Sequence, residues 1–162
     1  MRPVLVAVVL VLAAADPPAG NDGPAGATGA TATPTRHAGA TATLVVEVEG
    51  LKDDAGTVHA ALHASADGFP TRPEKALRQA DAPITGGRAR LTFDGLVPGG
   101  YAVSAYHDEN GNGKLDTGFL GIPSEGLAAS NDARGFMGPP SFEKARVEVA
   151  PGTNLIVVRM SY

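Results

Sequence analysis

The chain has 162 residues, no cysteine and a formal charge of -4 at pH 7. This length gives room for one domain, and without cysteine no disulfide can stabilise it. Acidic and basic residues are interspersed, so the sequence predicts no basic patch for nucleic acid or for an anionic membrane surface.

Residues 1–15 read MRPVLVAVVLVLAAA, with a basic second residue, an apolar run and small residues at the end. This pattern is typical of a secretory signal peptide that is cleaved after Ala15. The apolar run is shorter than the roughly 20 residues that a bilayer-spanning helix needs, so we expect no membrane span after cleavage. The sequence therefore predicts a periplasmic or extracellular protein.

Residues 16–41 are rich in Ala, Gly, Thr and Pro and contain almost no large apolar side chain. Such a composition cannot bury enough apolar surface to offset the entropy of ordering the chain. We expect a disordered tether here, followed by a folded domain over residues 42–162.

The folded part begins with two segments, 43–49 and 57–63, in which apolar and polar residues alternate. A period of two indicates half-buried strands, and the short connection between them predicts a hairpin. In the second segment, His59 and His63 fall on the face opposite the apolar residues. They stand roughly 13 Å apart along a strand, too far to share one metal ion, so we expect them on a solvated face.

Residues 65–82 break this alternation and predict a short helix or a crossing loop, with Pro73 near its first turn. The segment YAVSAYHD at 101–108 is apolar on both faces, which predicts a central strand. Further strands are expected over residues 88–93, 142–149 and 154–162. About seven short strands joined by turns indicate an all-β fold, an antiparallel β-sandwich like the immunoglobulin fold, with one long irregular loop.

Residues 107–116 read HDENGNGKLD and place oxygen-bearing side chains at alternate positions. Calcium takes six to eight oxygen ligands, and calcium loops supply them at this spacing with Gly at the sixth position. The candidate ligands are Asp108, Asn110, Asn112, Asp116 and the backbone carbonyl of Lys114. Phe119 stands at position twelve, where an EF-hand has Glu, so a standard EF-hand is excluded. We expect either calcium binding in the range of roughly 0.1 to 1 mM or a plain turn with local hydrogen bonds.

Residues 119–142 show no periodicity but are too apolar for disorder. A loop of this length in a compact domain is usually functional. It either packs against one end of the sandwich or forms a ligand groove beside the acidic loop. For an unknown protein or saccharide at the cell envelope, the candidate contact residues are Glu125, Asn131, Arg134 and Phe136.

His107 and the nearby carboxylates raise the alternative of an enzyme. The ring of His107 could act as a base together with Asp116 or Glu125 in a hydrolase of the cell envelope. No cysteine and no Ser in a strand-to-helix turn accompanies it as a nucleophile, so we expect a non-enzymatic protein. A purely structural accessory domain is the third possibility.

The segments HDENGNGKLDTGFLGIPSEG, SNDARG and GPPSFEKA together resemble the bacterial domain of unknown function 2141 family, over about Leu44 to Tyr162. The resemblance implies an exported β-sandwich domain with no established activity. More distantly, FDGLVPGGYAVSAY is similar to the strand-turn-strand motif of transthyretin-like and carboxypeptidase-regulatory-like domains. Hydrolases on the transthyretin fold end in Tyr-Arg-Gly-Ser, whereas this chain ends in Arg159, Met160, Ser161 and Tyr162, so that catalytic signature is absent.

The interpretation that we favour is an exported, non-enzymatic β-sandwich module. In it, calcium bound by residues 108–116 orders the neighbouring apolar loop as an interaction surface.

Overall fold

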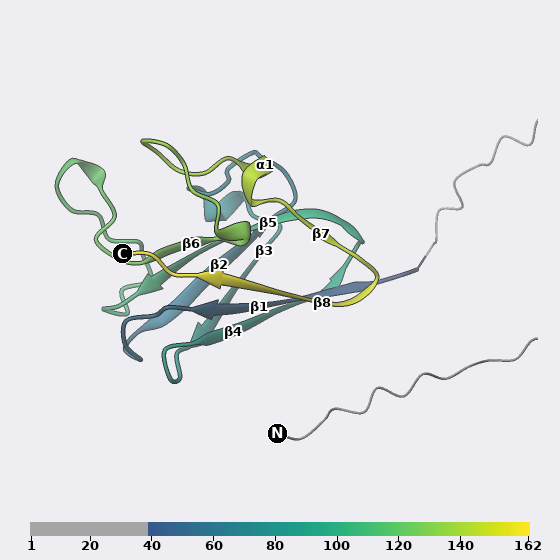
Figure 1. Cartoon of the computed structure of the whole chain (residues 1–162), viewed down its shortest axis with the longest axis horizontal. Helices are drawn as coiled ribbons and strands as arrows, with labels where there is room; N and C mark the ends of the chain where they lie inside the picture. The colour runs from purple at the N-terminus through teal and green to yellow at the C-terminus, as the bar shows by residue number, and fades with distance from the viewer. Residues whose placement is uncertain (1–38) are drawn as a thin grey trace, which may run out of the picture. The chain divides into compact units, whose positions relative to one another are not determined.

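The computed structural model describes residues 39–162 of the chain (Figure 1). The predicted signal peptide and almost all of the predicted tether lie outside the described residues. Within the described part the alternating segments form strands that make two sheets, which confirms the predicted all-β sandwich. No helix in this part is long and apolar enough to cross a membrane.

The smaller sheet has three strands in the order β4-β1-β8. Their bounds are β1 (Ala42–Glu49), β4 (Ala89–Leu96) and β8 (Gly152–Arg159). The larger sheet has the order β3-β2-β5-β6, and β7 also pairs with β5. Its bounds are β2 (Thr57–His63), β3 (Arg78–Pro83), β5 (Gly99–Asp108), β6 (Leu127–Ala129) and β7 (Val147–Val149). β5 lies between β2 and β6, so the predicted central strand is confirmed.

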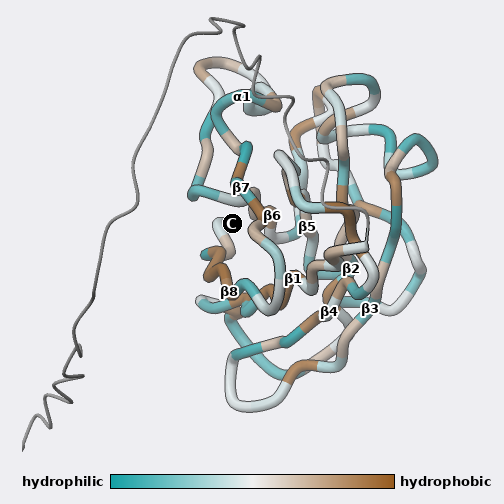
Figure 2. Tube along the Cα trace, turned by 90° about the vertical axis from the view of Figure 1, so that its right-hand side faces the viewer, coloured by the Kyte–Doolittle hydropathy of each residue, from teal (hydrophilic) through white to brown (hydrophobic). Residues whose placement is uncertain are grey.

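The core lies between the two sheets, and most of its side chains alternate with outward-facing ones along their strands. Figure 2 shows hydrophobic residues along the strands in brown. The completely buried members on the smaller sheet are Leu44, Val46, Val48 and Val158. On the larger sheet they are Val58, Leu62 and Val103. Burying one such side chain contributes about 1.5–3 kcal/mol to stability, so this alternation accounts for both strand formation and sheet packing.

The predicted hairpin between the first two strands is wrong. β1 and β2 belong to different sheets, because residues 50–56 cross from one layer to the other and bury Leu51 in the core on the way. β1 instead pairs antiparallel with β4 and parallel with β8. The sandwich is therefore antiparallel except for one pair of strands that are far apart in sequence.

The helix or loop predicted over 65–82 is only partly present. A short 3-10 helix, η1 (Pro73–Lys75), is followed directly by β3, an edge strand that pairs with β2. Ala82 is the one buried residue of β3. An edge strand held by backbone hydrogen bonds, with polar side chains on both faces, gives no apolar alternation to detect.

The strand predicted over 142–149 is replaced by one helical turn, α1 (Phe142–Ala145), and the short strand β7. Phe142 and Ala145 stand three positions apart, which puts them on the same side of a helical turn. Both are buried against Ala102 and Ala129 on the outer face of the larger sheet. This second, smaller apolar cluster favours a helical turn over a strand. The rest of the predicted irregular loop holds β6 and the 3-10 helices η2 (Phe119–Gly121) and η3 (Ser130–Asp132).

Candidate functional site

A groove of about 1290 Å³ runs over the outer face of the larger sheet. Its floor consists of side chains that point away from the core of the sandwich, since they alternate with the buried residues of the same strands. These floor residues are His59, Ala61, Ser104, Tyr106, Leu127 and Ala129. Parts of the loops 109–126 and 132–140 and the prolines of residues 70–73 form its walls.

Each of the two loops beside the groove carries exposed apolar side chains at its tip. We name these residues the apolar loop tips. The tip residues are Phe119, Leu120, Phe136 and Met137, with exposed fractions of 87%, 80%, 91% and 93%. Leu120 and Met137 also have positive φ angles of 65° and 57°, a strained conformation for bulky residues. The two loops therefore leave apolar surface uncovered beside the groove, and two of their residues adopt a costly backbone conformation.

The acidic loop predicted to bind calcium forms the wall of the groove next to β5. The carboxylate of Asp108 accepts the backbone N–H groups of Asn112 at 3.0 Å and Gly113 at 2.7 Å. The carboxylate of Asp116 accepts the side-chain amides of Asn110 at 2.6 Å and Asn112 at 3.0 Å. The structure therefore brings the predicted side chains together, but as hydrogen-bond donors and acceptors of one another.

These hydrogen bonds are the ones that the plain-turn alternative predicts. Lys114 adds one more, from its backbone N–H to Oδ1 of Asn112 at 2.8 Å, and its side chain lines the groove. Among residues 39–162, no group of three His, Cys, Asp or Glu side chains is placed to hold a metal ion. A carboxylate oxygen that accepts one N–H still has a free lone pair for a cation, so calcium binding by this loop stays a prediction.

A chain of three titratable side chains crosses the larger sheet at the same end of the groove. Nδ1 of His59 lies 2.6 Å from Oδ1 of Asp81, and its Nε2 lies 3.3 Å from Oδ2 of Asp108. The ring of His59 stacks on Tyr106 with 4.9 Å between the ring centroids. Sequence reasoning missed Asp81 and Tyr106, because the members of this cluster come from three different strands and share no local motif.

Two of these groups have shifted pKa values. Burial raises the pKa of the Asp108 carboxyl, but hydrogen bonds from the backbone amides of the loop and from His59 outweigh it, so the pKa is lowered overall. Burial, and then the negative charges of Asp108 and Asp81, raise the pKa of the Tyr106 hydroxyl. At neutral pH the buried carboxylate of Asp108 is therefore ionised, and the hydroxyl group of Tyr106 on the groove floor keeps its proton.

Glu125 fixes the acidic loop at both of its ends. Its side chain is only 6% exposed, and its carboxylate accepts the backbone N–H groups of Glu109 at 3.0 Å and Asp116 at 2.9 Å. Glu125 lines the groove, as a predicted contact residue should, but its oxygen atoms are occupied by the loop. Glu125 thus holds together the two ends of the acidic loop, which we call the neck of the loop.

The other predicted contact residues lie in different positions. Arg134 lines the groove and donates from Nη1 to Oγ of Ser161 at 3.2 Å. Asn131 donates its side-chain amide to the carbonyl oxygen of Arg146 at 2.7 Å, so it holds the end of α1 in place. Phe136 is one of the apolar loop tips. The structure thus brings Arg134 and Glu125 to the groove, whereas Asn131 and Phe136 do not line it.

His107, the base of the hydrolase alternative, is completely buried on the core side of β5. Its Nδ1 lies 2.6 Å from the hydroxyl oxygen of Tyr162, and its Nε2 lies 2.7 Å from the carbonyl oxygen of Ala55. Both ring nitrogens are therefore engaged within the protein, and neither forms a hydrogen bond with Asp116 or Glu125 in the described part of the chain.

The solvated face predicted for the two histidines of β2 is wrong for His63. His63 is only 1% exposed, and its ring packs edge to face on Phe69 with 5.3 Å between centroids. Neither of its ring nitrogens has a hydrogen-bond partner among the described residues, and burial lowers its pKa. The side chain of His59 is half-buried, at 24% exposed. Both lie on the outer face of the larger sheet, which later segments of the chain cover.

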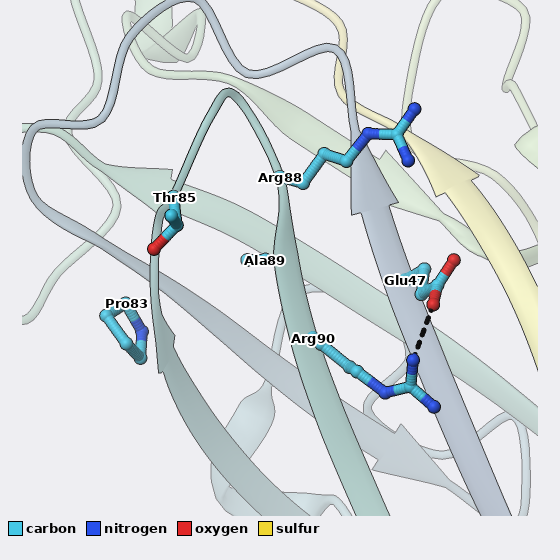
Figure 3. A pocket seen from close by; sticks show the side chains of 6 residues that line it. All are labelled: Glu47, Pro83, Thr85, Arg88, Ala89 and Arg90. Atoms are coloured by element: carbon cyan, nitrogen blue, oxygen red, sulfur yellow. Dashed lines mark hydrogen bonds and ion pairs between the residues drawn. The ribbon is translucent and has the colours of Figure 1, made fainter.

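A smaller pocket of about 350 Å³ lies where β3 turns into β4 (Figure 3). The side chains of Arg88, just before β4, and of Arg90, on β4, extend toward β1 and away from Pro83. Arg90 pairs with Glu47 at 2.8 Å, and Arg88 pairs with Glu49 at 3.2 Å. Because its charged groups neutralise one another across the sheet, this pocket has less to offer a ligand than the groove.

Comparison with known proteins identifies one family. The model of a family described as an uncharacterized protein conserved in bacteria (DUF2141) matches residues 46–156, which is more than half of the chain. No curated protein and no solved structure matches the chain.

Proposed function

This chain belongs to the bacterial DUF2141 family, and we propose that it is an exported, non-enzymatic binding module of the cell envelope. Its groove takes an extended segment of a partner protein. The observation that carries this proposal is the groove on the larger sheet together with the apolar loop tips beside it.

The size of the groove favours a chain segment over a small molecule. Sites for small ligands usually measure about 300–1,000 Å³, and the groove, at about 1290 Å³, is larger. It is also open along the sheet and bounded by two separate loops. An extended peptide can follow such a floor and place its side chains against both walls.

The chemistry of the groove suits a peptide with apolar side chains. Ala61, Leu127 and Ala129 make parts of the floor apolar, and Ile122 and Met137 do the same for the walls. Leu127, Ile122 and Met137 are 36%, 63% and 93% exposed, and covering such side chains gains about 25 cal/mol for each Å² removed from water. The hydroxyl groups of Ser104 and Tyr106 lie on the same floor and can bind the amide groups of a peptide backbone.

Calcium is the second part of the proposal. Gly113, Lys114 and Leu115 of the acidic loop line the groove, so an ion held by that loop would fix the position of one wall. The gathering of Asp108, Asn112 and Asp116 within hydrogen-bond distance supports this role.

Export rests on residues 1–15. The mature protein should begin at Asp16, and the mass of the chain purified from the periplasm or the medium tests this. A mass that includes residues 1–15 would contradict export through a cleaved signal peptide.

Binding can be tested with peptides selected from a random library on the mature chain. Ser104 lies on the floor, and Ser104→Trp fills the groove without touching the core. Thr92→Trp is the matched control, because Thr92 is exposed on the outer face of the other sheet. We expect the selected peptides to be apolar, to lose at least about tenfold in affinity for Ser104→Trp and to bind Thr92→Trp like the wild type. Equal binding to both variants would contradict the proposal.

A further inference from the structure

β8 is an edge strand of the smaller sheet. It pairs in parallel with β1 over its whole length and ends the strand order β4-β1-β8. In Figure 2 it lies along one side of the domain, with β1 and β4 following in that order. One side of its backbone is therefore not used by the sheet.

The parallel register shows which groups are free. The N–H of Gly152 donates to the carbonyl oxygen of Thr41, just before β1, at 3.1 Å, and the N–H of Met160 donates to that of Glu49 at 2.8 Å. The backbone groups of the even-numbered residues of β8 therefore face β1. The odd-numbered residues Thr153, Leu155 and Val157 direct their N–H and C=O groups to the open side. Within residues 39–162 no hydrogen bond is made by these groups.

Both ends of this free edge are closed. Pro151, before Thr153, has no N–H group. Arg159, after Val157, donates its backbone N–H to Oδ1 of Asp132 at 3.0 Å. The free edge thus has Leu155 at its centre, and Pro151 and Arg159 lie at equal distances on either side.

Between its two closed ends, this edge carries none of the usual protections against pairing. Natural edge strands usually carry a Lys, a Pro, a bulge or a covering segment. Between Thr153 and Val157 the strand has none of these residues and a regular register with β1. The side chains of Leu155 and Val157 are 56% and 39% exposed on the same outer face. A regular, uncharged and apolar edge favours the addition of another strand.

We propose that β8 pairs with β8 of a second copy of this chain, antiparallel and about a two-fold axis at Leu155. In this register Leu155 faces Leu155 of the second copy, and Thr153 faces Val157. The three pairs exchange about six backbone hydrogen bonds, two for each pair. The two smaller sheets join into one continuous sheet that crosses the dimer.

The pattern of the edge favours a second copy over an unrelated strand. About an axis at Leu155, Pro151 faces Arg159 of the second copy. The residue without an N–H therefore meets the residue whose N–H is already used by Asp132, and no backbone donor at the end of the interface is left unpaired. An edge whose closed ends match each other in this way is complementary to itself.

Cysteine substitutions in the mature chain test the register, because the chain has no cysteine of its own. Directly opposed residues in such a pair have Cα atoms about 5.5 Å apart, within the range that a disulfide bridges. We expect Leu155→Cys to form a covalent dimer on mild oxidation. Thr153→Cys and Val157→Cys should cross-link efficiently only when mixed. Thr92→Cys, exposed on the far strand of the same sheet face, is the control. Cross-linking of Leu155→Cys no faster than this control would overturn the proposal.

Charge reversal tests the pairing without a covalent bond. Leu155→Lys and Leu155→Glu each place two like charges at the axis and should raise the dimer dissociation constant at least about tenfold, measured by sedimentation. An equal mixture of the two variants should restore a dimer, which a folding defect could not do. The control Thr92→Lys should dimerise like the wild type. A monomeric wild type, or a dimer that is indifferent to these charges, would overturn the proposal.

Discussion

The two sheets of this sandwich use their outer faces in different ways. The outer face of the smaller sheet carries partly exposed ion pairs, such as Glu47 with Arg90 and Glu49 with Arg88, which water screens. The face of the larger sheet is covered by loops and α1, and there Asp108, Glu125 and His63 are almost completely buried.

This difference shows which face of the sandwich carries groups that are costly for stability. Exposed ion pairs cost little and contribute little, about 0–1 kcal/mol each. Buried polar groups are stable only while their hydrogen bonds are made, and His63 has no partner among the described residues. The larger sheet thus carries buried polar side chains, strained loop residues and a groove, and for these reasons we propose the binding surface there.

The largest expected effect comes from removing the cover of the larger sheet. Phe142 is 8% exposed in the apolar cluster with Ala102 and Ala145. Phe142→Ala should lower the free energy of unfolding by about 3 kcal/mol, because it leaves a cavity over the sheet. Thr92→Ala on the other face should change it by less than about 0.5 kcal/mol. Urea unfolding measures both, and equal losses would show that the two faces do not differ in this way.

A smaller effect is expected at the neck of the acidic loop. Glu125→Gln leaves one of two backbone N–H groups without its acceptor and should cost about 2 kcal/mol. Hydrogen exchange at the amides of Glu109 and Asp116 should accelerate in the same variant, because Glu125 binds both. Glu47→Gln is the matched control, since it breaks an exposed pair worth less than about 1 kcal/mol. Unchanged exchange at both amides would mean that Glu125 does not hold the loop.

Calcium should stabilise the chain by a still smaller amount if the acidic loop binds it. At an ion concentration ten times the dissociation constant, the free energy of unfolding should rise by about 1.4 kcal/mol. A melting curve with and without calcium, at constant ionic strength, measures the rise, and Asp116→Asn should reduce it. Asp94→Asn, an exposed carboxylate of β4, should respond to calcium like the wild type. Equal melting points with and without calcium would remove the ion from the proposed function.

The smallest effect is a dependence on pH at the buried histidine. Burial puts the pKa of His63 in the folded chain below its value of 6.5 in the unfolded chain. As the pH falls, the unfolded chain therefore binds a proton at this histidine before the folded chain does. The contribution of neutral His63 to the free energy of unfolding is complete above pH 6.5 and decreases as the pH drops below that value. His63→Phe keeps the shape of the ring and should flatten the stability profile between pH 7.5 and pH 5.5. The same slope in the variant and the wild type would assign it to other groups.

The sequence predicted those strands whose apolar residues form a local pattern along the chain. β5 was identified as central because both of its faces are apolar, and β1 and β2 because their residues alternate. β3 was missed because its side chains are mostly exposed, and an edge strand needs only its backbone to pair. The parallel pairing of β1 with β8 had no local signal, since the choice between partners depends on how the whole sandwich closes.

The candidate site shows the same limit. The acidic loop could be identified because its polar residues are contiguous. The contact of His59 with Asp81 and Asp108 joins three strands, so no spacing along the chain predicts it. His63 was predicted to be solvated because the sequence of β2 does not show what covers the strand. Phe69 and Phe142, from elsewhere in the sequence, cover this end of the sheet.

The position of Glu125 has a consequence for how this domain can vary. Because one carboxylate holds both Glu109 and Asp116, the two chain ends that enter the loop are fixed whatever lies between them. Doubling the length of a flexible insert there costs only about 0.6 kcal/mol in closure entropy. Residues 110–115 can therefore vary in sequence beside the groove, provided that two backbone N–H groups of the loop still bind the buried carboxylate of Asp108.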